Sequence, residues 1–229
     1  MEPARGMFLE PEKAHAVPAL EAGLVVVVTF FVSAFASFFF LSVFGIGPAL
    51  VLGELLILVI PLGYLLLKRV NVRSYVRIDL KPKYVPIGVA SGLALFLLDI
   101  LVLLLLTSVF GTSQAVEETN MLLAETSSTT AGVVMVAASL VLAGIGEEFL
   151  FRGFFQNALT RRYSFLPALV ASAVVFGVFH PDFQLVYTLS AMASGVLLGY
   201  VYYRWSYVPA AVAHTTNNLI VFTLLLLGF

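Results

Sequence analysis

The chain has 229 residues, of which 61% are hydrophobic and only 11% charged, and its mean hydropathy is +1.04. A soluble domain of this size needs far more charge to cover its surface, so the composition excludes an ordinary soluble globular protein. The formal net charge of −1 gives no indication of a nucleic-acid partner. The sequence contains no cysteine, which excludes disulfides and thiolate metal sites and leaves the redox compartment open.

Residues 1–22 form a mixed, polar stretch without the apolar core of a cleavable signal peptide. We therefore predict a polar N-terminal tail over 1–22, in which His15 is a surface residue, followed by a single membrane domain over 23–229. The first apolar run, from Gly23 to about Gly45, is long enough to remain in the membrane as a span.

Apolar runs of about 20 residues, the length that crosses the hydrocarbon core, recur along the rest of the chain. They predict an all-α, polytopic transmembrane bundle of about seven helices. The predicted spans are roughly 23–45, 49–67, 85–110, 130–152, 166–181, 184–204 and 207–228. The fourth can continue as a helix to about Arg161, and the hydroxyl-bearing residues 126–130 can cap its start.

The basic residues predict the orientation, because cytoplasmic loops carry an excess of lysine and arginine. The segment after the second span holds Lys68, Arg69, Arg73, Arg77, Lys81 and Lys83. The other basic residues fall on the same side: Arg5, Lys13, Arg152, Arg161, Arg162 and Arg204. The opposite side has only acidic residues, namely Glu117, Glu118, Glu125 and Asp182. The N-terminus is therefore predicted to be cytoplasmic.

Two acidic residues stand alone in otherwise apolar spans. Glu54 lies in the second span and Asp99 in the third. A charged side chain inside a bilayer costs about 2.5–3.5 kcal/mol on the insertion scale. The simplest interpretation is that each carboxyl group hydrogen-bonds to a neighbouring helix.

The fourth span contains the segment GEEFLFR, from Gly146 to Arg152. Glu148 and Arg152 are four residues apart and share a helix face, so they can form a salt bridge. Glu147 is rotated by about 100° from Glu148 and has no evident partner on its own helix. It is the candidate general base. The alternative is that both glutamates belong to one ion network that packs the helices.

Two further pairs of residues are also four positions apart, so that each pair shares one face of a helix. Phe176 and His180 lie at the end of the fifth span, and His214 and Asn218 lie inside the seventh. At 1.5 Å per residue, Glu147 and His180 both lie about 20 Å from the inner ends of their helices. These depths are compatible with one cluster, so the residues predict a buried acid–base site formed by the fourth, fifth and seventh spans.

The motifs EExxxR, FxxxH and HxxxN resemble, in order, spacing and placement, those of the CAAX prenyl protease family. This family is also called the Abi or CPBP group of intramembrane proteases and includes the Ras-converting enzyme. The resemblance covers about residues 130–220. It implies that Glu147 and His180 activate a water molecule and that His214 and Asn218 stabilise the oxyanion. The supporting residues that it implies are Glu148, Arg152 and Phe176.

The sequence does not decide whether the site uses a metal ion. Glu147, His180 and His214 could form a zinc ligand set with a position left for water. A metal-free mechanism uses the same residues, and we favour it because Asn218 on the face of His214 resembles an oxyanion donor more than a ligand.

The expected activity is that of an endopeptidase acting on a membrane-associated, lipid-modified or prenylated peptide or protein. The expected location is the plasma membrane of a prokaryote or the endoplasmic reticulum membrane of a eukaryote. A proton-coupled transporter is an alternative, since intramembrane acids also mark proton pathways, but the sequence has no inverted repeat. A noncatalytic membrane scaffold is a third possibility.

Overall fold

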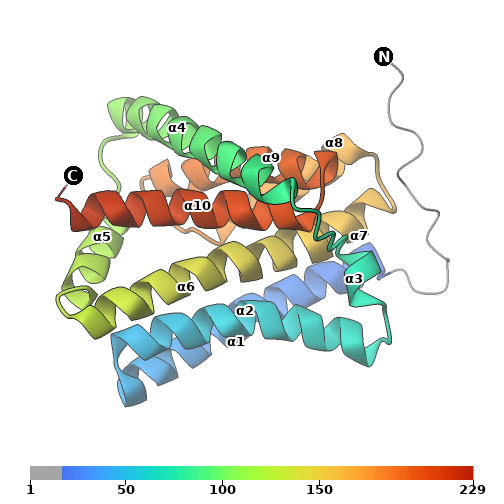
Figure 1. Ribbon diagram of the computed structural model, residues 1–229, viewed down its shortest axis with the longest axis horizontal. Helices are drawn as coiled ribbons and strands as arrows, with labels where there is room; N and C mark the ends of the chain where they lie inside the picture. Colours follow the sequence, from blue (N-terminus) through green and yellow to red (C-terminus); the bar gives the residue numbers. More distant parts are fainter. Residues whose placement is uncertain (1–16, 229) are drawn as a thin grey trace.

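The computed structural model describes residues 17–228, and over this range it consists of helices and connecting turns without a strand. Figure 1 shows the long helices lying side by side, with their axes running roughly along the long axis of the molecule. Their bounds are α1 Ala19–Phe44, α2 Ile46–Leu67, α3 Val72–Tyr75, α4 Tyr84–Phe110, α5 Gln114–Thr126, α6 Thr130–Glu148, the π-helix η2 Phe149–Gln156, α7 Asn157–Thr160, α8 Phe165–Val178, α9 Val186–Arg204 and α10 Tyr207–Leu226.

Five helical stretches in the described part of the chain are long and apolar enough to cross a membrane: α1, α2, α4, the continuous run Thr130–Thr160, and α10. They correspond to the first four predicted spans and the seventh. The predicted fifth and sixth spans appear as α8, which has 14 residues, and α9, which is less apolar. The all-α membrane class is confirmed, whereas the number of seven crossings stays a prediction.

Helix α6 occupies the middle of the bundle and packs against α2 on one side and α10 on the other (Figure 1). Helix α10 also packs against α4 and α9, while α1 lies on α2 and α8 on α9. The outer faces of α1 and α4 expose large apolar side chains such as Phe35 and Leu101. Such faces are expected where helices contact lipid, because lipid tails replace water as their surroundings.

One end of the bundle gathers the basic residues. There the Arg77 guanidinium donates to the backbone carbonyls of Tyr202 and Trp205, and Asn157 donates to the carbonyl of Tyr75 at 2.6 Å. The basic residues of this end are Lys68, Arg69, Arg73, Arg77, Lys81, Lys83, Arg161, Arg162 and Arg204. Helix α5, with its three glutamates, lies at the opposite end (Figure 1).

This separation is the one from which the sequence predicted the orientation, except that Arg152, counted there with the other basic residues, is fully buried and paired with Glu148. The side of the membrane stays a prediction. Arg5, Lys13 and His15, and with them most of the predicted tail 1–22, lie outside the described residues. Helix α1 begins at Ala19 rather than at the predicted Gly23.

Helix α6 and the helix before it, α5, each begin at a hydroxyl side chain that caps the helix. Thr129 caps α6, because its hydroxyl oxygen accepts from the Gly132 amide at 3.1 Å, which confirms the predicted start signal. Helix α5 was not predicted as a helix. It is amphipathic, and the Ser113 hydroxyl caps it by accepting from the Val116 amide at 3.1 Å.

Gly144 allows α10 to approach α6 closely. A Cβ atom at this position would lie 2.7 Å from the backbone nitrogen of Thr215 and 2.9 Å from its Cα atom. Backbone atoms cannot move aside as a flexible side chain can, so Gly144→Ala should destabilise the protein by about 1–3 kcal/mol. The measurement is the melting temperature of the purified protein in detergent.

Gly63→Ala is the matched control, since Gly63 lies inside α2 with nothing within 4 Å of an added Cβ. This variant should melt at the wild-type temperature or slightly above it, because alanine favours the helix. Equal melting temperatures for the two variants would contradict the close contact between α6 and α10.

Candidate active site

The two adjacent glutamates lie where α6 passes into the π-helix η2. Glu147 and Glu148 end α6, and η2 follows from Phe149 to Gln156 with every residue buried. A π-helical turn is rare and is frequently found at functional sites, because it changes the directions of the side chains along the helix. Nothing in the sequence predicted this change of helix type.

Glu148 and Arg152 form a fully buried salt bridge. Arg152 Nη1 donates to Glu148 Oε1 at 2.7 Å, and both side chains have no exposed surface. Arg152 Nη2 also donates to the Gly195 carbonyl of α9 at 3.3 Å, and the guanidinium lies 4.3 Å from the centre of the Phe176 ring. The ion pair expected from the four-residue spacing is therefore present, and it connects η2 to α8 and α9.

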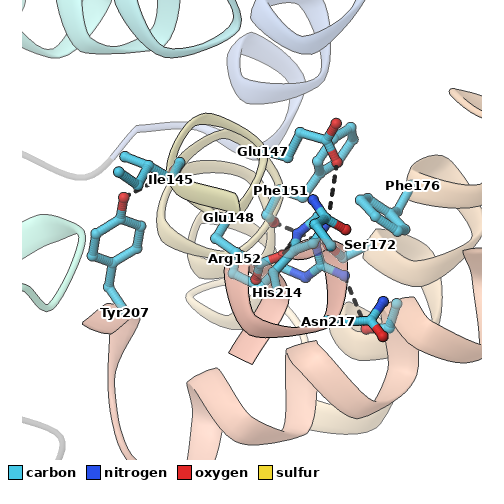
Figure 2. A network of polar contacts seen from close by, with 12 residues as sticks. Ile145, Glu147, Glu148, Phe151, Arg152, Ser172, Phe176, Tyr207, His214 and Asn217 are labelled. Atoms are coloured by element: carbon cyan, nitrogen blue, oxygen red, sulfur yellow. Dashed lines mark hydrogen bonds and ion pairs between the residues drawn. The ribbon is translucent and has the colours of Figure 1, made fainter. Parts of the chain in front are cut away.

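Glu148 has a second partner that the sequence did not predict. His214 Nδ1 lies 3.0 Å from Glu148 Oε1, so this nitrogen donates to the carboxylate. The other ring nitrogen, Nε2, faces Glu147 and lies 4.0 Å from its Oε2 atom (Figure 2). Phe176 packs edge-on against the imidazole, with 5.9 Å between the ring centres. Glu148 thus fixes the orientation of His214 as well as pairing with Arg152.

His180 lies just beyond the end of α8, in the turn that leads to α9. Its Nδ1 atom is 2.8 Å from the Phe176 carbonyl oxygen and donates to it, which leaves Nε2 free to accept a proton. The ring lies between those of Phe176, at 4.8 Å, and Tyr187, at 5.2 Å. Thr188 donates to the His180 carbonyl at 2.7 Å and holds the turn in place.

The two asparagines of α10 point to different neighbours. Asn218 donates to the Leu140 carbonyl of α6 through a long contact of 3.4 Å. Asn217 donates to Asp99 Oδ2 at 2.9 Å, and Ser194 of α9 donates to Asp99 Oδ1. Asp99 is therefore satisfied by two neighbouring helices, as the sequence predicted for it.

A cavity of about 810 Å³ brings the candidate residues together. Glu147, His180, His214 and Asn218 all line it, although they come from α6, the α8–α9 turn and α10. The remaining wall is mostly apolar and comes largely from α1, α2 and α5. The sequence assigned these helices no part in the site, and here they enclose it.

Two further ionisable residues line the cavity and were not predicted as site residues. Tyr187, at the start of α9, lies in the wall and packs against His180. Glu54 of α2 also lines the cavity, and its Oε2 atom is buried without a hydrogen-bond partner. The expected hydrogen bond to a neighbouring helix is therefore not made by this oxygen. The only sequence signal for Glu54 was its isolation as an acid in an apolar span.

The residues of the alternative zinc ligand set are not arranged as a metal centre. Within residues 17–228, no group of three or more His, Asp or Glu side chains is placed to hold a metal ion. The set Glu147, His180 and His214 does not fit a zinc ion in this arrangement, so we derive no step through a metal.

Residues 129–220 match the model of a known protein family. The matching family is described as Rce1-like, type II CAAX prenyl endopeptidase Rce1-like. Comparison with the curated proteins and with the solved structures gives no match. The matched segment runs from the cap of α6 into α10 and contains all three motifs. The match over residues 129–220 confirms the resemblance of this part of the chain to the CAAX protease family.

Proposed function

We propose that this protein is an intramembrane endopeptidase that hydrolyses a peptide bond in a membrane-associated or lipid-modified substrate. One observation carries the proposal: Glu147, His180, His214 and Asn218 line a single cavity within the segment that matches the Rce1-like family. A buried carboxylate, two imidazoles and an amide are the groups that hydrolysis of an amide bond requires.

In the proposed mechanism, Glu147 and His180 activate the attacking water. Glu147 Oε2 has no hydrogen-bond partner, and at 4.0 Å its contact with His214 is too long for a direct hydrogen bond. This oxygen is therefore available to a water molecule. His180 presents a free Nε2 lone pair to the same cavity because its Nδ1 proton is held by the Phe176 carbonyl. Both groups can take a proton from water as it attacks the carbonyl carbon.

His214 and Asn218 are the proposed oxyanion donors. The imidazole of His214 lies between the carboxylates of Glu147 and Glu148, so it can donate from both nitrogens once it carries two protons. Asn218 can turn its amide from the weak contact with Leu140 towards the cavity that it already lines. Donors in such a low-dielectric site stabilise a developing negative charge strongly.

The proposed setting is a multi-pass membrane protein in which α8 and α9 complete seven crossings. The N-terminus is cytoplasmic in this proposal, because the basic residues of the described part gather at one end of the bundle. The membrane would be the plasma membrane of a prokaryote or the endoplasmic reticulum membrane of a eukaryote. We propose a substrate that reaches the cavity from the lipid, and prenylation of that substrate is one form of the lipid modification.

The test compares cells that contain the wild-type protein with cells that contain Glu147→Gln. Mass spectrometry of membrane proteins should find peptides cut only in the presence of the wild type. A farnesylated, internally quenched peptide and its unmodified counterpart then measure the effect of the lipid on purified protein in liposomes. Two results together would contradict the protease and favour a transporter. One is the same set of cleaved peptides in wild-type and Glu147→Gln cells, and the other is ion flux across the liposomes that depends on Glu147.

The proposed mechanism also predicts that activity does not depend on zinc. Dialysis of the purified protein against a strong chelator should leave the cleavage rate within about twofold, because activation of water here relies on general base catalysis. Elemental analysis of the same sample gives the metal content. Stoichiometric zinc, together with activity that is lost to the chelator and restored by added zinc, would contradict the metal-free mechanism.

A further inference from the structure

Glu54 is a second carboxyl group in the cavity, beside that of Glu147, and its position is set by close packing of α2 on α6. Its backbone oxygen would lie 3.3 Å from a Cβ atom placed on Gly146, the residue directly before Glu147. The absence of a side chain at Gly146 therefore brings the backbone of α2 against α6 at the level of Glu147. Both carboxyl groups then line the same cavity.

Glu54 differs from the other isolated acid of the apolar spans. Both oxygens of Asp99 accept hydrogen bonds, one from Ser194 and one from Asn217. Glu54 Oε2 is buried and has no partner. A polar atom left unsatisfied inside a membrane is expensive, and an intramembrane acid that is not used for packing is a candidate for function.

Hydrolysis of an amide needs a group that can donate a proton to the leaving nitrogen. The carbon–nitrogen bond breaks readily only when the leaving nitrogen receives a proton, whereas Glu147 and His180 are assigned to removing a proton from water. We propose that Glu54, in its protonated form, is the general acid that donates this proton to the leaving amine. This inference rests on the endopeptidase function proposed above.

Water attacks the carbonyl carbon and loses one proton to Glu147 or His180, and the carbonyl oxygen becomes the oxyanion. The carbon–nitrogen bond then breaks as the nitrogen takes the proton of Glu54, which leaves a new carboxyl group, a free amine and the Glu54 carboxylate. The proton taken from water returns to Glu54 through the cavity, so the net change is the addition of one water molecule.

The experiment uses two probes with the same acyl segment, of which only one has a leaving group that must be protonated. One is a farnesylated peptide with an amide at the scissile position, and the other is the same acyl segment as a para-nitrophenyl ester. The phenolate leaves without protonation. Glu54→Gln should lower hydrolysis of the peptide at least about 100-fold and hydrolysis of the ester less than about threefold. Glu54→Asp, which keeps an acid, should retain more peptide cleavage than Glu54→Gln.

Two variants complete the design. Asp99→Asn is the control for loss of an intramembrane acid outside the cavity, and it should hydrolyse both probes at rates close to those of the wild type. Glu147→Gln should lose both activities, because each requires an activated water. Equal losses of peptide and ester hydrolysis in Glu54→Gln, or unchanged peptide hydrolysis, would overturn the role of Glu54. A wild type that hydrolyses neither probe, nor any membrane peptide, would instead overturn the endopeptidase itself.

Discussion

Glu147→Gln is expected to lower the rate of peptide cleavage by about 100- to 10,000-fold, the range that loss of a general base produces. The amide has nearly the shape of the carboxylate but cannot take a proton from water. Glu147 Oε2 has no hydrogen-bond partner to lose, so the fold should be undisturbed. The measurement is the turnover of a quenched peptide, together with the melting temperature of the same preparation.

Glu125→Gln is the matched control, because Glu125 is an exposed acid at the end of α5. It should cleave and melt like the wild type. Cleavage by Glu147→Gln at the wild-type rate would show that another residue activates the water. A large drop in melting temperature would instead mean that Glu147 belongs to the ion network that holds the helices together.

Arg152→Ala is expected to destabilise the protein by about 3–5 kcal/mol, because it leaves the Glu148 carboxylate buried without its cation. The substitution also removes the contacts of the guanidinium with the Gly195 carbonyl and the Phe176 ring. Since Glu148 orients His214, cleavage should fall as well. The measurements are the melting temperature in detergent and the turnover of the quenched peptide. Arg162→Ala, at an exposed position, should change stability by no more than about 0.5 kcal/mol.

A double variant separates the two roles of this ion pair. Replacing Glu148 and Arg152 together by Leu and Met removes both charges of the pair, and such replacements by apolar residues are often neutral for stability. The double variant should therefore melt closer to the wild type than Arg152→Ala does. Its activity should stay low, because the carboxylate that accepts from His214 is gone. Full activity in the double variant would contradict the positioning role of Glu148.

The sequence by itself predicted the features that depend on neighbouring residues in the chain. Runs of apolar residues located the helices, since the length of such a run decides whether it can cross a bilayer. The four-residue spacing of Glu148 and Arg152 predicted their salt bridge, and Thr129 was within the stretch predicted to cap α6. These contacts form within one helix, so their geometry follows from the helical repeat alone.

Only the tertiary structure decided how those helices are turned towards one another. The contact between Glu148 and His214 joins residues 66 positions apart, and nothing local in the sequence indicates it. Glu54 and Asp99 looked equivalent as lone acids, yet α2 turns Glu54 towards the cavity and α4 turns Asp99 towards Ser194 and Asn217. The rotation of an apolar helix about its axis is set by packing at small residues such as Gly144 and Gly146. An almost uniformly apolar helix surface carries too little pattern to predict that rotation.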